Sequence, residues 1–225
     1  MYSTIHNSEP TKDQFAKYQE LYNYFNKKLF EGKLPAIILN FSRQANVAGF
    51  FAPDRWISSQ GTDKTHEISI NPTYMANVDF IEVCQTLVHE QAHLWQMAFG
   101  KPSRTGYHNK EWAKKMESIG LMPSSTGKEG GKKVGQKMSD YVIQGGIFEK
   151  VFKELPENIA LPWVANERRS IDQDAGEEGN GSSNAEPKPK SKIKYTCQSC
   201  GLNVWGKPDI DVYCKPCEKH LESCE

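Results

Sequence analysis

Two histidines and a glutamate fall within five consecutive residues of this 225-residue chain, in the run His89-Glu90-Gln91-Ala92-His93. Residues four apart share one face of a helix, so the imidazoles of His89 and His93 can bind one metal ion together. Glu90 would lie beside that ion and take a proton from bound water, whose pKa zinc lowers towards ~7. The pattern predicts a mononuclear zinc hydrolase site that cuts peptide bonds.

A catalytic zinc site needs a third protein ligand and an open position for water. His108 is the best candidate, because a loop containing Gly and Pro separates it from His93 and lets the chain turn back. Glu111 and Glu117 are weaker rivals on the same expected helix, since carboxylates also complete such sites. The remaining histidines lie in the N-terminal segment, an expected strand and the C-terminal module (His6, His66 and His220).

Four of the six cysteines form two C-x-x-C pairs near the C-terminus, Cys197/Cys200 and Cys214/Cys217. Each pair makes a tight turn that directs two thiolates at one ion, and four thiolates suit tetrahedral zinc. The alternative, a redox dithiol, does not account for two matched pairs. We therefore expect two zinc ions per chain, one catalytic and one structural. Of the other cysteines, we expect Cys84 to be buried in the catalytic helix and Cys224 to be a spare thiol.

The HExxH motif lies in a stretch that predicts a long helix over 80–98. Asp79 fits the N-cap position, and Gly100 with Pro102 ends the helix. Apolar residues cover much of the helix circumference, which indicates a helix buried in the domain. Imidazole and carboxylate groups are costly in such a helix unless a metal binds them. This context favours a zinc site over two ordinary core histidines.

The residues before this helix predict another helix and a small sheet. Residues 11–31 carry aromatic residues and leucines at three- and four-residue steps, as in an amphipathic helix. Three strands are expected next (36–42, 47–52 and 66–70), with a turn-rich loop over 53–64. After the motif we expect a helix and a short extended piece (109–119 and 141–143).

The third of these strands begins with His66 and could lie beside the active-site cleft. An extended substrate would then pair with it through backbone hydrogen bonds. The simpler interpretation is that His66 is an ordinary strand histidine.

A sharp change in composition divides the chain. The stretch 166–193 has almost no apolar residue and predicts a disordered linker. It separates an expected metalloprotease domain at 12–165 from the cysteine module at 194–225, and 1–11 is expected to be a flexible N-terminus. No apolar run is long enough for a transmembrane helix, and no secretory signal is recognisable. We therefore expect a cytoplasmic protein that does not engage membranes.

Net charge alone gives no sign of a nucleic-acid partner, because 28 basic residues balance 28 acidic ones. The region 101–137 differs, with nine basic residues against three acidic ones, and could attract phosphate. A solvated surface and loop would show the same charge pattern. We single out as candidate nucleic-acid contacts four lysines of this region and two residues of the cysteine module (Lys128, Lys132, Lys133, Lys137, Trp205 and Lys207).

Several separated motifs resemble the SprT-like metalloprotease family, which includes bacterial SprT-like proteins and the eukaryotic protease Spartan. They are LFEGKLP, NVAGFF and EISINP before the catalytic helix, then TLVHEQAHLWQ, YHNKEWAKKMESIGL and TGKEGGKKVGQKMSDY. The resemblance covers roughly 12–155. It implies an α+β, zincin-like domain in which His89, His93 and His108 bind zinc and Glu90 is the general base. Many bacterial members also end in a zinc ribbon, as the cysteine pairs indicate here.

The eukaryotic branch of the family is linked to proteolysis of proteins crosslinked to DNA, with DNA activating the protease. The resemblance therefore implies a protein substrate and a DNA partner, single-stranded or containing junctions, and association with the nucleoid. Spartan's long C-terminal interaction motifs are absent from this chain. One alternative is a non-catalytic zinc protein that binds nucleic acid, associated with transcription or stress. Another is a peptidase with no role at DNA.

Overall fold

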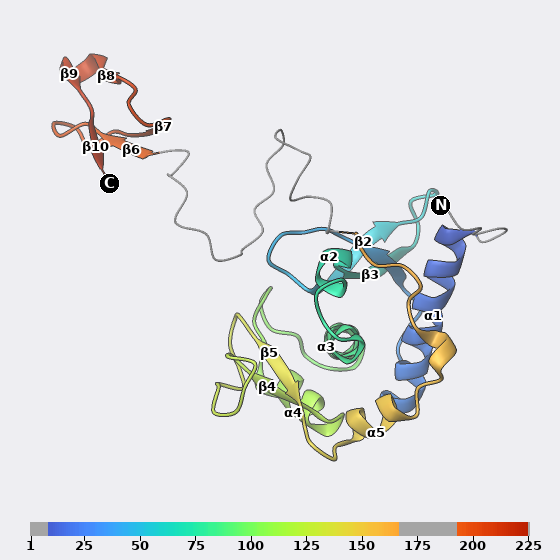
Figure 1. Cartoon of the computed structure of the whole chain (residues 1–225). Helices are drawn as coiled ribbons and strands as arrows, with labels where there is room; N and C mark the ends of the chain where they lie inside the picture. Colours follow the sequence, from blue (N-terminus) through green and yellow to red (C-terminus); the bar gives the residue numbers. More distant parts are fainter. Residues whose placement is uncertain (1–8, 167–192, 225) are drawn as a thin grey trace. The chain divides into compact units, whose positions relative to one another are not determined.

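The computed structural model describes residues 9–166 and 193–224, and contacts between residues divide the chain into two compact units. The N-terminal unit, described over 9–166, combines helices with small sheets, which confirms the α+β class (Figure 1). The C-terminal unit, described over 193–224, consists of short strands and turns. The expected linker at 166–193 lies, apart from its two end residues, outside the described residues.

The main sheet of the N-terminal unit has three strands in the order β1-β3-β2 (β1 Ile38–Phe41, β2 Gly49–Ile57, β3 Lys64–Ile70). Strand β3 is parallel to β1 and antiparallel to β2, so it lies in the centre. This central position does not favour substrate pairing along the strand that starts near His66, and it agrees with the simpler interpretation of His66 as an ordinary strand histidine. Residues 67–70 of β3 carry neighbours on both sides, and the edge strands are β1 and β2.

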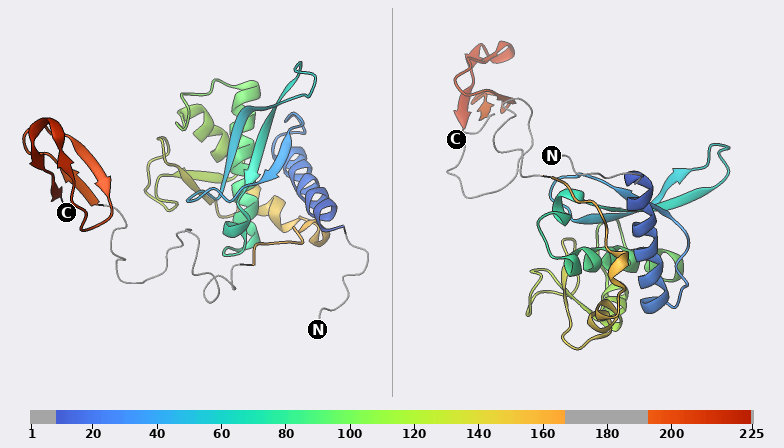
Figure 2. Two further views of the ribbon diagram at one scale, coloured as in Figure 1. Left: turned by 90° about the horizontal axis from the view of Figure 1, so that it is seen from above. Right: turned by 45° about the vertical axis from the view of Figure 1, so that its right-hand side comes forward.

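Strand β2 is longer than expected, because it continues through residues that were assigned to a loop. The register between β2 and β3 shifts between Ala52 and Trp56, as in a β-bulge. Pro53 lacks the N–H that a regular ladder needs, and the bulge accommodates it. The loop shrinks to 58–63 and is closed by Ser58, whose N–H donates to the Asp63 carbonyl at 2.7 Å. The resulting hairpin extends beyond the body of the unit in both views of Figure 2.

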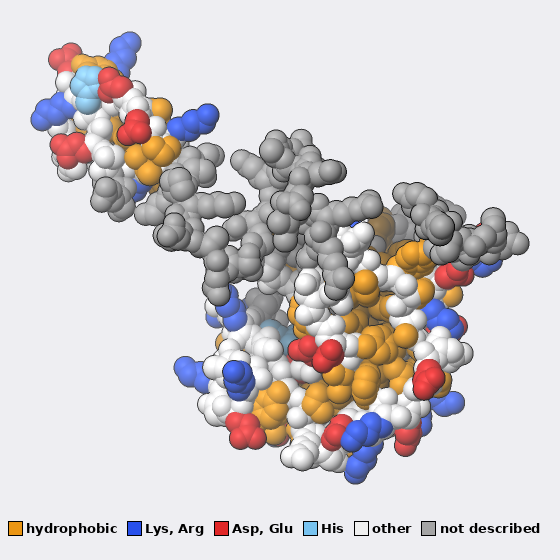
Figure 3. All heavy atoms as spheres, in the orientation of Figure 1, with side chains coloured by type: hydrophobic (Ala, Val, Ile, Leu, Met, Phe, Trp, Pro, Cys, Tyr) orange, Lys and Arg blue, Asp and Glu red, His pale blue; other side chains and the backbone are white. Residues whose placement is uncertain are grey.

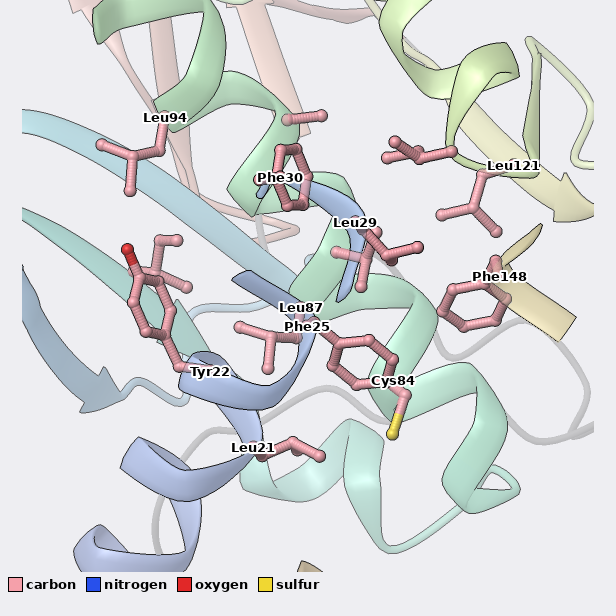
Figure 4. Close-up of a cluster of buried hydrophobic side chains, with 14 of the residues drawn as sticks. Leu21, Tyr22, Phe25, Leu29, Phe30, Cys84, Leu87, Leu94, Leu121 and Phe148 are labelled. Carbon is pink, nitrogen blue, oxygen red and sulfur yellow. The ribbon is translucent and has the colours of Figure 1, made fainter. Parts of the chain in front are cut away.

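Helices α1 (Pro10–Leu29) and α3 (Phe80–Phe99) form most of the core. Leu21, Tyr22 and Phe25 repeat at helical spacing on α1 and are fully buried, or nearly so. They pack with apolar residues of α3 such as Leu87 (Figure 4). Burying an aromatic or aliphatic side chain of this size stabilises the fold by about 1.5–3 kcal/mol. This core therefore fixes α3 in place whether or not a metal is bound.

Helix α3 starts and ends as the sequence predicts. Asp79 is the N-cap, and its N–H donates to the Glu82 carboxylate at 3.1 Å, as in a capping box. Gly100 is the C-cap and follows Phe99 directly. A short helix, α2 (Pro72–Met75), joins β3 to α3.

The chain after α3 forms a helix and a second hairpin. Helix α4 (Lys110–Ser118) begins at Asn109, whose side-chain oxygen accepts the Trp112 N–H at 3.1 Å. Strands β4 (Leu121–Ser124) and β5 (Ser139–Val142) then pair antiparallel around a loop, 125–138. Only part of β5 was expected, because four-residue strands give little periodic signal.

Two elements that were not expected complete this unit: α5 (Ile147–Lys153) and a 3-10 turn η1 (Glu157–Ile159). The segment after them returns to α1, where the Gln14 side chain accepts the Trp163 N–H and donates to its carbonyl, each at 2.9 Å. Helix α1 begins at Pro10, so the last two residues of the expected flexible N-terminus are helical. No helix in the described ranges is long and apolar enough to cross a membrane.

The C-terminal unit is a small set of antiparallel strands. A three-stranded sheet has the order β10-β6-β7 (β6 Ile193–Thr196, β7 Asn203–Gly206, β10 Glu222–Cys224). A hairpin, β8 (Tyr213–Cys214) and β9 (Lys219–His220), encloses a 3-10 turn η3 (Lys215–Cys217). The buried core consists of Tyr195, Leu221 and two cysteines. This is too little apolar surface to stabilise the unit alone.

Candidate metal centre

Three histidine side chains converge between α3 and the start of α4. His89 and His93 lie one turn apart on α3, and His108 immediately precedes the N-cap of α4. One ring nitrogen of each lies within 4.8 Å of those of the other two. The Nε2 atoms of His93 and His108 are 3.0 Å apart. Two nitrogens on a tetrahedral zinc ion would be about 3.3 Å apart, so the spacing of this pair is compatible with zinc.

Hydrogen bonds to the opposite ring nitrogens fix the orientation of two of these histidines. His89 Nδ1 lies 2.7 Å from a carboxylate oxygen of Asp140 on β5. His108 Nδ1 lies 3.2 Å from the Gly135 carbonyl oxygen in loop 125–138. A carboxylate and a carbonyl oxygen can only accept hydrogen bonds, so the Nδ1 atom of each of these two histidines carries the proton. The Nε2 atom of each then presents a lone pair toward the candidate metal position. Gln85 holds Asp140 in turn, donating to its carboxylate at 2.8 Å.

The indole of Trp112 forms the floor beneath the three imidazoles. Its ring centroid lies 4.9 Å from that of His89, 5.2 Å from His93 and 4.4 Å from His108. Trp112 is completely buried, and it stacks nearly parallel to His93. The indole therefore limits the rotation of all three rings at once.

The pKa values of two of the three histidines suit a metal site. Burial, followed by the charge of His89, lowers the pKa of His108 to about 4. Burial also holds the pKa of His93 well below its usual value. Burial alone would lower the pKa of His89, but the hydrogen bond to Asp140 and the charge of Glu90 more than offset this and raise it. His93 and His108 are thus neutral at pH 7, as metal ligands must be.

Glu90 lies beside this cluster in a largely buried position, with 7% of its surface exposed. Burial raises the pKa of its carboxyl group, while the charge of His89 and the backbone N–H of Phe51 on β2 lower it. Gly49 allows the close approach of β2 to α3, because a Cβ there would meet Thr86 at 2.9 Å. Glu90 therefore lies where β2 approaches α3, in a setting that raises the pKa of its carboxyl group.

The two carboxylates considered as rival third ligands are engaged elsewhere. Glu111 accepts the Lys101 N–H at 2.7 Å and the Gln96 amide at 2.8 Å. Glu117 pairs with Lys133 at 2.9 Å. His66 accepts the Asp54 N–H at 2.9 Å on the β2–β3 hairpin, and His220 pairs with Asp211 in the C-terminal unit. His6 lies outside the described residues.

The four cysteines of the C-terminal unit form a second cluster. All four sulfurs lie within 4.8 Å of one another, and those of Cys200 and Cys214 are 3.7 Å apart. Two thiolates on a tetrahedral zinc ion would be about 3.8 Å apart. The backbone N–H groups of Cys200 and Ser199 lower the pKa of Cys197 to about 6, which favours the thiolate. Cys197 and Cys214 are fully buried or nearly so, which fits a closed structural site.

The candidate nucleic-acid contacts fall on two separate surfaces. Lys128, Lys132, Lys133 and Lys137 are exposed on loop 125–138. Figure 3 shows Lys and Arg side chains projecting at this edge of the N-terminal unit, with a histidine visible beside them. In the C-terminal unit, Trp205 is 63% exposed on β7 opposite Lys194 of β6, and Lys207 is also exposed. The described part of that unit carries four lysines and four acidic residues, so its charge gives no preference for nucleic acid.

Sequence reasoning missed the residues that support the ligands: Asp140, Gly135, Gln85 and Trp112. Three of these contacts join residues far apart in the sequence: Asp140 is 51 residues from His89, Gly135 is 27 residues from His108, and Gln85 is 55 residues from Asp140. Trp112 is the nearest of them in the sequence, four residues after His108 and in the first turn of α4. A carboxylate directed at a metal-bound histidine is a frequent arrangement, but the sequence does not say which carboxylate serves.

Comparison with known proteins identifies one family. Residues 18–129 match the sequence profile of the SprT-like family, a range that includes the three histidines and Glu90. No curated protein and no solved structure gives a significant match.

Proposed function

Because the chain belongs to the SprT-like family, we propose that its N-terminal unit is a zinc-dependent metallopeptidase with a zincin-like fold. His89, His93 and His108 hold the catalytic zinc, and Glu90 is the general base. The observation that carries the proposal is the convergence of three imidazoles beside a buried carboxylate. A second zinc, bound by Cys197, Cys200, Cys214 and Cys217, stabilises the C-terminal unit as a zinc ribbon.

Zinc held by His89, His93 and His108 would supply a Lewis acid and lower the pKa of a water at the site. Glu90 would accept the proton of the attacking water and return it to the leaving amine. Burial raises the pKa of Glu90, which makes the protonated form easier to reach during this transfer. Asp140 and Gly135 keep the imidazoles of His89 and His108 oriented throughout. Trp112 excludes water from beneath the site.

Strand β2 provides the place for an extended substrate. Phe51 of β2 stands opposite Ile68 in the β2–β3 ladder, and its backbone N–H donates a hydrogen bond to the Glu90 carboxylate. This part of β2 therefore lies at a sheet edge next to the general base. A peptide that adds as a strand to this edge would bring its scissile bond to Glu90. This fits a peptidase better than a hydrolase of small molecules.

For the substrate class, we propose proteins associated with or crosslinked to DNA. The support is the lysine-bearing loop 125–138, which is directly bonded to His108 through Gly135. A nucleic-acid strand on these lysines would hold attached proteins near the peptidase site.

The alternative is a zinc protein that binds nucleic acid without catalysis. Glu90 argues against it, since a buried carboxylate with a raised pKa costs stability and a structural site needs no base. A closed structural site would also use a fourth protein ligand, as the four cysteines of the C-terminal unit do.

The test compares wild type with Glu90→Gln on a DNA-bound protein substrate, with and without single-stranded DNA. We expect the variant to keep both zinc ions and DNA binding but to lose cleavage by at least ~100-fold, the usual contribution of a general base. The matched control is Glu20→Gln, an exposed glutamate of α1, which should cleave like wild type. Equal cleavage by Glu90→Gln and wild type would overturn the peptidase proposal. Equal cleavage by wild type with and without DNA would favour a peptidase with no role at DNA.

Metal analysis provides an independent check. The intact protein should contain two zinc ions, and a His89→Ala/His93→Ala double variant should contain one. A single zinc in the intact protein would mean that one of the two sites is assigned wrongly.

A further inference from the structure

A pocket of about 390 Å³ lies against the main sheet, and Glu67 of β3 forms part of its wall. Ile68 and Ile70 of the same strand are fully buried in the core, where β3 packs against α3. Side chains alternate along a strand, so Glu67 points to the opposite face of the sheet. The pocket therefore lies across the sheet from α3 and the histidine site.

Glu67 is a buried carboxylate without a basic partner. It is 4% exposed, and each of its two oxygens accepts one hydrogen bond, from Trp56 Nε1 at 2.6 Å and from Ser69 Oγ at 2.6 Å. An ionised carboxylate can accept about four hydrogen bonds, so part of its acceptor capacity is unused. In the described ranges no lysine, arginine or histidine forms an ion pair with it. A carboxylate withdrawn from water in this way is stabilised by a cation.

Aromatic rings flank this carboxylate. Phe50 and Trp56 both line the pocket, and in the β2–β3 ladder they stand opposite Ser69 and Thr65, two residues to either side of Glu67. Their side chains therefore project from the same face of the sheet as Glu67. Aromatic rings beside a carboxylate attract a cation, above all a planar guanidinium group that can stack on them.

A small side chain on β2 leaves a passage from the sheet edge to Glu67. Ala52 stands directly opposite Glu67, so its methyl group projects from the same face. A peptide added to the free edge of β2 would place one residue in line with Ala52 and Glu67, two strand spacings or about 9–10 Å from β3. The side chain of that residue would cross the Ala52 methyl group between Phe50 and Trp56. Only a long side chain can reach Glu67 by this route.

We propose that this pocket is a subsite for a basic side chain, arginine above lysine, of an extended peptide that lies along β2. The proposal rests on the proposed function for the position of that peptide. The guanidinium group would donate to the unused acceptor sites of Glu67 and stack on the aromatic rings. Arg55 also lines the pocket, but it is exposed and forms no ion pair with any described residue, so water and salt screen its charge.

The first experiment measures the binding of short labelled peptides to the zinc-loaded Glu90→Gln protein by fluorescence anisotropy. One peptide carries a single arginine in an uncharged sequence, and its partner carries citrulline there, which has the same shape without the charge. We expect the arginine peptide to bind about tenfold more tightly, the contribution of one hydrogen bond between charged groups. Equal binding of the two peptides, or no binding of either, would overturn the proposal.

Two variants test the location of the subsite. Glu67→Gln removes the charge and should bind both peptides alike. Ala52→Leu keeps Glu67 but fills the passage across β2, and it should lose the preference for arginine as well. The matched control, Asp63→Asn, removes an exposed carboxylate from the same hairpin and should keep the preference. Circular dichroism and zinc content verify that each protein is folded. A preference that persists in Ala52→Leu, or disappears in the control, contradicts the proposal.

The indole N–H of Trp56 reports on the subsite directly, because it donates to Glu67. Its NMR signal, identified by its loss in Trp56→Phe, should shift when the arginine peptide binds and shift less with the citrulline peptide. An unchanged signal in the presence of bound arginine peptide would place the arginine elsewhere and refute the subsite.

Cleavage by the wild-type protein distinguishes a failure of this proposal from a failure of the peptidase proposal. Moving the arginine along a cleavable peptide should raise kcat/KM at one position only, because neighbouring residues of a strand face opposite sides of the sheet. Absence of cleavage, together with tighter binding of the arginine peptide, would overturn the peptidase proposal and support the subsite. Cleavage with no dependence on the position of the arginine would do the reverse.

Discussion

The two candidate metal sites of this protein differ in what surrounds them. The histidine site lies on a helix that is already fixed by a core of more than twenty buried apolar residues. Two residues of the cysteine site, Cys197 and Cys214, make up half of the buried core of the C-terminal unit. Tyr195 and Leu221 make up the other half. Metal in the first site can serve chemistry because the fold does not depend on it. Metal in the second holds the fold and has no open position for a substrate.

The largest effect expected from this comparison is the response to metal removal. Chelation of all zinc, or Cys214→Ser, should unfold the C-terminal unit, because structural zinc contributes about 10–16 kcal/mol in small modules. The N-terminal unit should stay folded under the same treatment. NMR spectra of the full chain would show loss of dispersed signals from 193–224 alone. Dispersed signals from that unit in metal-free protein would contradict the comparison.

The next effect concerns one tryptophan from each unit. Trp112→Ala removes a fully buried indole beneath the histidines and should destabilise the N-terminal unit by about 3–5 kcal/mol. Trp205→Ala removes a mostly exposed indole from the C-terminal unit and should change stability by less than about 0.5 kcal/mol. Thermal unfolding of both variants measures the contrast. Equal losses of stability would mean that Trp112 does not support the three imidazoles.

A smaller effect is expected for Asp140→Ala. Loss of a carboxylate bonded to a metal-binding histidine lowers metal affinity by about 10–100-fold. The change should be confined to the histidine site, and the zinc of the C-terminal unit provides the reference. Chelator competition measures both affinities in one sample. Asp140→Asn should lose less zinc affinity, because its amide oxygen can still accept a hydrogen bond from the His89 N–H. Unchanged zinc affinity in Asp140→Ala would show that His89 needs no partner.

The smallest expected effect is on the pH dependence of peptide cleavage. Burial raises the pKa of Glu90 from 4.5, so on acidification this carboxylate gains its proton earlier than an exposed glutamate would. A general base must be ionised, and kcat/KM should therefore fall as the pH drops through a value above 4.5. Zinc content measured at each pH separates this effect from loss of metal. Full activity maintained below pH 4.5 would exclude Glu90 as the base.

Features encoded within a short stretch of sequence were predicted well. The spacing of apolar residues predicted both long helices, and each predicted end lies within two residues of the observed one. Helix formation and capping depend on neighbours along the chain, so a short stretch of sequence contains the necessary signal. Pairing of β4 with β5 depends on a partner strand fifteen or more residues away, and only part of β5 was predicted from the sequence. The bulge at Pro53 likewise extended β2 through what composition indicated was a loop.

For the metal sites, the sequence by itself determined which groups are available. His89 and His93 share a helix face because of their spacing, and each C-x-x-C pair closes on one ion for the same local reason. The tertiary structure alone decided which of these groups meet. Glu111 and Glu117 contact other partners, Asp140 and Gly135 orient the imidazoles, and β2 lies at the sheet edge next to Glu90. These contacts join residues distant in the sequence, and their formation depends on how the core packs rather than on local preference.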